Sequence, residues 1–154
     1  MNNATSSETT PRADPDVLEA LEYLRQTYES LHTDQLRNTR EGHWINEAFV
    51  VRLYAVLEAH RVVGNKKGIE TALAGASKVD ACRRLRNQIA HSKAEISDRE
   101  SRKLDQVLRH TFGLGGQNSL FDAKYILAKD TVLRPLHDAC VSYSEALLKR
   151  ENAT

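Results

Sequence analysis

The sequence predicts an all-α fold, an up-and-down bundle of four to five helices. Apolar residues recur at steps of three and four along most of the 154 residues, which is the period of an amphipathic helix. No stretch shows the alternation of a half-buried strand, and no internal repeat is evident. A chain of this length buries about 70% of its unfolded surface, which suits one domain with a real core.

The first half of the chain predicts two long helices. A helix over residues 15–36 follows from Asp14-Pro15 at its start and from the apolar residues Val17, Leu21, Leu24, Tyr28 and Leu31. A polar turn at 38–42 should follow it. Residues 45–63 are apolar on nearly all sides, so we expect a central helix that touches several neighbours and ends at Gly64.

The second half predicts three further helical segments. We expect residues 68–74 to form one or two helical turns. Ser77 with Asp80 is an N-cap pattern that opens the next helix, and Ser97 with Glu100 is a capping box that opens the one after it. In that later helix the inward residues are Leu104, Val107, Leu108 and Phe112, before a glycine-rich break at 113–118.

The last helix carries Leu133, Leu136, Cys140, Tyr143 and Leu147 at three-four spacing, with Pro135 in its first turn or at a kink. We expect a disordered tail at 1–13, a helical domain at 14–150 and a frayed end at 151–154. The two cysteines, Cys82 and Cys140, lie on apolar helical faces, which indicates packed, reduced thiols. With no signal peptide and no apolar run of ~18 residues, the expected location is the cytoplasm.

Positive charge gathers in the second half of the chain. The net charge is only +1, but residues 1–41 carry four arginines against eight acids, and residues 78–110 carry nine basic residues against five acids. Such asymmetry is a modest indication of contact with nucleic acid. An ordinary solvated helix face explains a charge run of this size equally well.

The most informative segment is Arg86-Asn87-Gln88-Ile89-Ala90-His91. On a helix Arg86 falls inside the apolar stripe that contains Leu85 and Ile89, and a buried arginine needs an anion. Asn87 and His91 are four residues apart and share a flank, so these groups could converge on one phosphate. The alternative is a helix-terminal histidine beside an arginine that reaches out to solvent along its aliphatic stem.

This segment resembles the RNxxxH form of the RxxxxH motif of HEPN domains, small helical bundles of which many cut RNA. The resemblance is specific over residues 79–92 and looser over 43–149. It implies a helical bundle and a dimer whose motif helices face each other. It also implies that a polar residue of the preceding helix supports the site, here Glu58 beside Tyr54. The alternative for Glu58 is an ion pair with Arg61.

RNA cleavage without a metal needs proton transfer and charge stabilisation, which histidine and arginine supply together. His91 would be the acid/base and Arg86 the phosphate clamp, with Asn87 as a positioning group. The products would be a 2′,3′-cyclic phosphate and a 5′-hydroxyl. Because one chain offers a single motif histidine, two copies of Arg86 and His91 in one cleft would complete the site.

Metal and cofactor sites find little support. The only Glu-x-x-His is Glu29 with His32, whereas helical di-iron bundles need two such pairs and two further carboxylates. His137 and Cys140 share a face, but two ligands do not make a zinc site. The glycines at 113–116 follow a helix and lack the lysine of a phosphate loop. No cofactor is therefore expected.

These patterns favour a metal-independent endoribonuclease of HEPN type that serves as a toxin or in phage defence. Its partners would be RNA, a second copy of the chain in a composite site, and an antitoxin or regulatory protein, with no membrane. The alternative is a non-catalytic HEPN bundle that binds RNA, a nucleotide or a protein partner.

Overall fold

A computed structural model describes residues 11–64, 67–90, 98–113 and 127–153. These residues form five α-helices: α1 (Val17–Leu31), α2 (Arg40–Ala59), α3 (Ala76–Ala90), α4 (Asp98–Phe112) and α6 (Arg134–Asn152). A short 3₁₀ segment, η1 (Asp34–Leu36), follows α1, and a π-helical segment, η2 (Lys129–Leu133), leads into α6. The predicted all-α bundle is confirmed.

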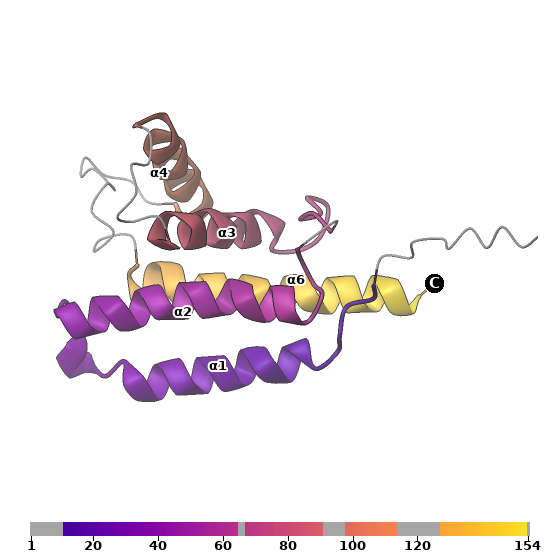
Figure 1. Cartoon of the computed structure of the whole chain (residues 1–154), viewed down its shortest axis with the longest axis horizontal. Coiled ribbons are helices and arrows are strands. Elements are labelled where there is room, and N and C mark those ends of the chain that lie inside the picture. Colours follow the sequence, from indigo (N-terminus) through magenta and orange to yellow (C-terminus); the bar gives the residue numbers. More distant parts are fainter. Residues whose placement is uncertain (1–10, 65–66, 91–97, 114–126, 154) are drawn as a thin grey trace, which may run out of the picture.

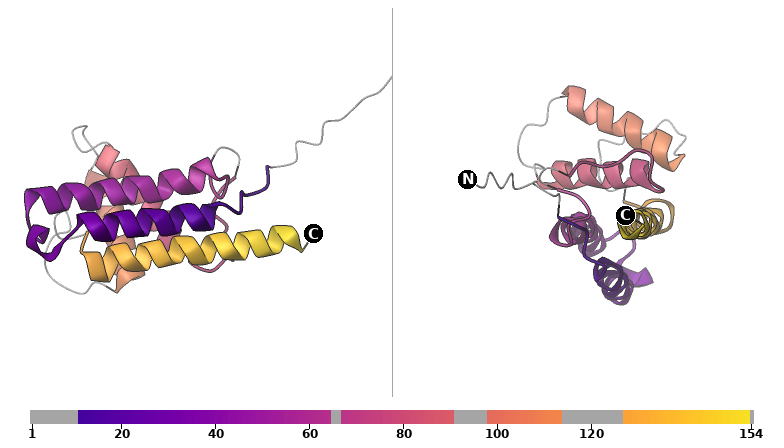
Figure 2. Two further views of the ribbon diagram at one scale, coloured as in Figure 1. Left: turned by 90° about the horizontal axis from the view of Figure 1, so that it is seen from below. Right: turned by 90° about the vertical axis from the view of Figure 1, so that its right-hand side faces the viewer.

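Helix α2 packs against α1, α3 and α6, which makes it the central helix that the sequence predicts. Helices α1, α2 and α6 run nearly side by side, and α3 lies across α2 and α6 (Figures 1 and 2). Helix α4 packs on the outer side of α3. Helix α3, which carries the Arg86 segment, is therefore covered by α2 and α6 on one side and by α4 on another. The rest of its surface, next to α2, stays uncovered by these helices.

The core is built from the apolar faces that the sequence pattern indicates. The fully buried side chains are Val17 and Leu21 of α1, Leu53 and Leu57 of α2, Val79 of α3, and Leu136, Tyr143 and Leu147 of α6. Helix α4 contributes Leu108. Each large side chain removed from water stabilises the fold by about 1.5–3 kcal/mol, so these faces fix the rotation of every helix about its axis.

Three helix boundaries in the first half differ from the prediction. The first helix ends at Leu31 rather than 36, and only η1 continues it. The central helix begins at Arg40, not 45, because the Thr39 side chain accepts a hydrogen bond from the Gly42 amide at 3.0 Å and caps it. It ends at Ala59, since Arg61 takes a left-handed conformation with φ of 60°.

The segments around α3 and α6 also differ in detail. Residues 68–74 form turns instead of a helix, and α3 starts at Ala76, so Ser77 is not its cap. Ser97 lies outside the described residues. Leu104 and Leu108 are buried and Val107 and Phe112 half-buried, as predicted. Pro135 lies in the first turn of α6.

The ends of the described chain are tied together. Ala13 is buried, and its amide donates to the Glu151 carboxylate at 2.8 Å. The same carboxylate binds the Lys67 ammonium at 2.9 Å. Helix α6 continues through Glu151 to Asn152, inside the segment for which fraying is expected. Ala13 belongs to the packed domain instead of the tail.

Cys82 of α3 and Cys140 of α6 are both free and buried, which confirms packed thiols. The hydrogen bond with Cys140, together with burial, raises the pKa of the Cys82 thiol. No helix in the described part of the chain has the length and apolar character needed to cross a membrane.

Candidate functional site

Helix α3 directs Arg86 toward α2 because its apolar side chains fix its rotation. Val79, Cys82 and Leu85 are buried, whereas Ala90 at the end of the helix is exposed. Arg86 follows Leu85 at the edge of this face, so its side chain emerges at the junction of α3 and α2. Only 27% of the side chain remains accessible to solvent.

Three side chains hold the Arg86 guanidinium. Its Nη1 lies 2.7 Å from the Glu58 Oε1, and its Nε donates to the Asn87 Oδ1 at 3.0 Å. The Cζ lies 4.4 Å from the centre of the Tyr54 ring, within the range of a cation–π interaction. The structure therefore brings together Arg86, Asn87, Glu58 and Tyr54, which we call the Arg86 cluster.

The cluster leaves part of the guanidinium available. A guanidinium has five N–H donors in one plane, and the two hydrogen bonds to Asn87 and Glu58 use two of them. No further polar partner of Arg86 occurs among the described residues. The remaining N–H groups lie on Nη1 and Nη2, the edge that binds a phosphate through two parallel hydrogen bonds.

Tyr54 supplies a rigid floor for the cluster. Its side chain is buried, and burial raises the pKa of its phenol, so the ring stays neutral. Glu58 is more exposed, with 41% of its side chain accessible. One face of the guanidinium is thus covered by an aromatic ring, and the carboxylate stands at the rim, where solvent or a ligand reaches it.

His91 follows directly after α3 and lies outside the described residues. The structure thus places four of the five predicted site residues in contact and leaves the position of the fifth undetermined. Neighbouring arginines of α3 are not part of the cluster. Arg83 and Arg84 each lie 2.9 Å from the Asp80 carboxylate, to which they donate.

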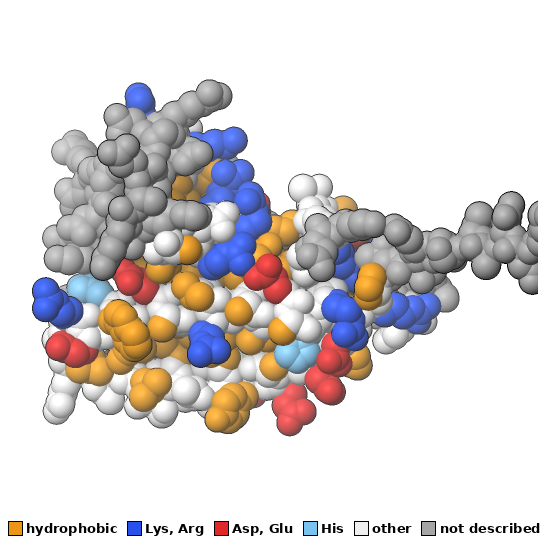
Figure 3. Space-filling model, in the orientation of Figure 1, with side chains coloured by type: hydrophobic (Ala, Val, Ile, Leu, Met, Phe, Trp, Pro, Cys, Tyr) orange, Lys and Arg blue, Asp and Glu red, His pale blue; other side chains and the backbone are white. Residues whose placement is uncertain are grey.

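The surface around the cluster is basic. Lys and Arg side chains gather over α3 and α4 on the face shown in Figure 3. This position agrees with the excess of basic residues over 78–110 in the sequence. A polyanion would meet this surface before it reached Arg86.

The simpler alternative for Glu58 is wrong. Its partner is Arg86, 28 residues away, and the Arg61 Nε donates instead to the Arg12 carbonyl oxygen at 2.9 Å. His60 is half-buried, with its Nδ1 2.9 Å from the Val56 carbonyl oxygen, which fits a structural histidine.

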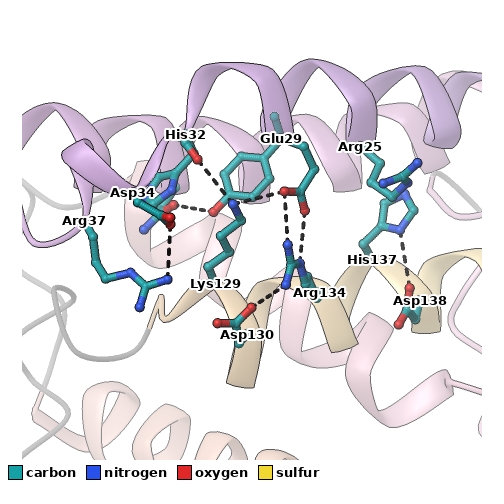
Figure 4. A network of polar contacts seen from close by, with 12 residues as sticks. Arg25, Glu29, His32, Asp34, Arg37, Lys129, Asp130, Arg134, His137 and Asp138 are labelled. Carbon is teal, nitrogen blue, oxygen red and sulfur yellow. Dashed lines mark hydrogen bonds and ion pairs between the residues drawn. The ribbon is translucent and has the colours of Figure 1, made fainter.

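A second polar network joins α1 to η2 and α6 on another side of the molecule (Figure 4). Glu29 lies 3.0 Å from both the Lys129 Nζ and the Arg134 Nε. The hydrogen bonds from Arg134, and next those from Lys129, lower the Glu29 pKa to about 2, against the opposing effect of burial. These ion pairs hold α6 against α1. The Glu29 carboxylate is already paired with the Lys129 and Arg134 side chains.

The histidines of the rejected metal motifs are also structural. His32 is buried and stacks on Tyr28, and the His137 Nε2 lies 2.9 Å from the Leu21 carbonyl oxygen. Within the described ranges no three His, Cys, Asp or Glu side chains are grouped as metal ligands.

An exposed apolar face between α1 and α2 was not predicted from the sequence. Tyr23, Leu31 and Trp44 are 72%, 54% and 70% exposed, and they border a groove of about 460 Å³. Orange side chains mark this face in Figure 3, below the basic surface. The periodicity of α1 placed Leu31 on the inward side, but its position in the last turn carries it beyond the core.

Comparison of the chain with protein-family models, curated proteins and solved structures gives no match. Function is therefore inferred from the residues of the Arg86 cluster and from the resemblance of the segment that carries Arg86 and Asn87.

Proposed function

We propose that this chain is a metal-independent endoribonuclease of the HEPN type, with a role as a toxin or in phage defence. The observation that carries the proposal is the Arg86 guanidinium, which is held by Glu58, Asn87 and Tyr54 and has N–H groups on Nη1 and Nη2 with no partner among the described residues. Structural arginines are usually satisfied by their ion pairs. Arg86 lies on α3, and Lys and Arg side chains gather over α3 and α4 (Figure 3).

The reaction follows from what these side chains do. Arg86 binds the scissile phosphate through Nη1 and Nη2 and stabilises the extra charge that develops on its oxygens. Asn87 orients the guanidinium through Nε, so the fork is preorganised before RNA binds. His91 protonates the departing 5′ oxygen. The products are a 2′,3′-cyclic phosphate and a 5′-hydroxyl.

The expected partners are RNA and an antitoxin or regulatory protein. A second copy of the chain, with its own Arg86 and His91 in a shared cleft, is one way to provide the second group for proton transfer. The Arg86 cluster offers a nearer group, which the next subsection develops.

Replacing Arg86, which would bind the phosphate, and His91, the proposed acid, tests the proposal. Arg86→Ala and His91→Ala should each lower cleavage of a mixed-sequence RNA by at least ~100-fold, the scale of a lost acid or charge stabiliser. Arg84→Ala is the matched control, because Arg84 lies on the same helix but binds Asp80. Gel analysis of RNA fragments and circular dichroism of each variant measure activity and fold.

A wild-type chain that binds RNA without cutting it would replace the nuclease with the second candidate, a non-catalytic HEPN bundle. In that case Arg86→Ala should weaken RNA binding while His91→Ala leaves it nearly unchanged. The free edge of Arg86 supports phosphate binding under both functions, so cleavage alone separates them.

A further inference from the structure

The contact between Glu58 and Arg86 points to a further catalytic residue. RNA cleavage by the 2′-hydroxyl needs a base as well as an acid, and His91 can serve only one of these roles in a single step. Glu58 is a carboxylate with a partly exposed side chain, and it binds the guanidinium that would hold the phosphate. It therefore stands beside the reacting groups.

Glu58 would lie close enough to a phosphate bound by Arg86 to reach the 2′-hydroxyl of the adjoining ribose. Glu58 accepts a hydrogen bond from Nη1 at 2.7 Å, and Nη1 carries a second N–H that faces away from it. Two acceptors on the two hydrogens of one nitrogen lie roughly 5 Å apart. A phosphate oxygen on the second N–H would thus lie about 5 Å from the carboxylate, a separation that the 2′-hydroxyl of the preceding ribose can bridge.

We propose that Glu58 is the general base of this site, an assignment that rests on the proposed nuclease function. Its carboxylate takes the proton of the 2′-hydroxyl as that oxygen attacks phosphorus. The bond from phosphorus to the 5′ oxygen then breaks, and His91 gives its proton to that oxygen. Glu58 thus supplies the base for proton transfer, and Arg86 links that base to the phosphate.

The conservative variant Glu58→Gln distinguishes two roles for Glu58, a general base and a residue that only positions Arg86. A glutamine oxygen still accepts from Arg86, but the amide takes up no proton. We expect kcat to fall by ~10²–10⁴-fold, with unchanged binding of an RNA analogue that carries a 2′-deoxyribose at the cleaved position.

Chemical rescue gives an independent readout. Glu58→Ala opens space at the rim of the cluster, and added formate should restore cleavage in proportion to its concentration. Arg86→Ala should show no such response. Mixing inactive Glu58→Gln and Arg86→Ala chains should restore nothing, since both residues act within one chain.

Glu58→Gln activity within threefold of the wild type would overturn the assignment. So would a loss of cleavage that is fully explained by weaker binding of the deoxy analogue, or recovery of activity in the mixed chains, which would indicate a site shared between two copies. A wild-type chain that cuts no RNA would instead remove the proposed function, so the two failures are distinguishable.

A different observation concerns the exposed face between α1 and α2. Along α2, Glu41, Ile45, Ala48 and Arg52 follow one another at steps of four, three and four and share one stripe. Arg52 is exposed and lines the apolar groove. Neither Arg52 nor Glu41 has an ion-pair partner among the described residues. Arginine is enriched at protein interfaces, and Arg52 and Glu41 carry opposite charges that could pair between two chains.

The spacing of Glu41 and Arg52 allows the same two residues to form ion pairs between two copies of α2. Glu41 and Arg52 are eleven residues apart, about three helical turns or ~16 Å. If two copies of α2 pack antiparallel about a two-fold axis midway between 46 and 47, Glu41 of each copy lies opposite Arg52 of the other. The same axis places Trp44 over Ala48 and Phe49, which line the groove.

The structure assigns this face, by that pattern, to a second copy of the chain. Trp44 of one copy enters the groove of the other, and two Glu41–Arg52 pairs flank the contact, which is the repeated pattern of a two-fold interface. Along α2, Tyr54 lies about eight and Glu58 about twelve residues from the axis, or ~11 and ~17 Å. Each copy thus keeps its own Arg86 cluster.

Charge reversal tests the register. Glu41→Arg and Arg52→Glu should each make the chain monomeric in sedimentation, because like charges then face each other twice. An equimolar mixture should recover dimers, since both pairs are again opposite in sign. Glu145→Arg on α6, an exposed site away from this face, is the control and should not change the wild-type state.

Trp44 is the only tryptophan of the chain, so its fluorescence should shift to longer wavelength when the dimer dissociates on dilution. A wild-type chain that stays monomeric at every concentration would overturn the inference. A dimer that survives both single charge reversals would do the same, because it would use another surface.

Discussion

Arg86 lies half inside the bundle because its neighbours on α3 are apolar and its charge is met by Glu58 of α2. The sequence predicted both residues, since Arg86 falls within an apolar stripe and such an arginine needs an anion. It did not predict their pairing, because Arg61 is closer to Glu58 along the chain and satisfies the usual helical spacing. Whether Glu58 pairs with Arg86 or with Arg61 depends on how α3 crosses α2, and no local sequence pattern encodes that crossing.

Glu29 predicts how stability depends on pH. Its pKa of about 2 lies below the ordinary value of 4.5, so the unfolded chain binds more protons between these values. The stabilisation is therefore complete above pH 4.5 and is lost as the pH falls toward 2. Because the Arg134 side chain is half exposed, we expect a contribution of about 1 kcal/mol.

Chemical unfolding of Glu29→Gln at a series of pH values measures this contribution. The variant should be less stable than the wild type at pH 7, and the difference should vanish near pH 2. Glu145→Gln, an exposed change on α6, controls for the altered net charge. A difference that stays constant with pH would show that the effect comes from packing.

Helix boundaries were predicted less well than helix faces, and the reason lies in the turns. The buried residues of α6 fall where three-four spacing puts them, since the period of an amphipathic helix is a repeated signal. The start of α2 depends on one cap at Thr39 after Asn38 with φ of 61°. Several polar residues nearby could cap equally well, so the sequence alone does not select Thr39.

The start of α3 gives a prediction at the scale of an element. Gly75 has φ of 78°, and a Cβ there would lie 2.6 Å from the Ala139 carbonyl oxygen of α6. Gly75→Ala should therefore destabilise the fold by about 2 kcal/mol or more, from backbone strain and the separation of α3 from α6.

Gly68→Ala is the matched control, because a Cβ at Gly68 meets no atom within 4 Å. Its free energy of unfolding should differ from that of the wild type by less than ~0.5 kcal/mol. Equal stability of the two variants in denaturant titrations would contradict the close approach of α3 to α6.

For the whole molecule, the contact between Cys82 and Cys140 reports on opening of the core. Both thiols are buried between α3 and α6, and hydrogen bonding and burial raise the pKa of Cys82. Neither thiol should react with an aromatic disulfide reagent in the native chain, because reaction needs an exposed thiolate. Both should react together once the chain unfolds in denaturant. Rapid reaction of either thiol in native buffer would show that the two helices separate locally.

The all-α bundle and its core were predicted because they follow from a repeated pattern over the whole chain. The apolar face with Trp44 was not, since an exposed and a buried apolar residue look alike in sequence. Four of the site residues were predicted and lie together, but motif and resemblance carried that prediction, and the position of His91 lies outside the described residues.

The central claim is that Arg86 and its neighbours cut RNA by transesterification without a metal. The most direct measurement is the chemistry of the RNA ends after incubation with the purified chain in excess EDTA. The account predicts fragments with 2′,3′-cyclic phosphate and 5′-hydroxyl ends, formed by the wild type and by Arg84→Ala but not by Arg86→Ala. Fragments with 5′-phosphate ends, or activity that requires added magnesium or manganese, would contradict it.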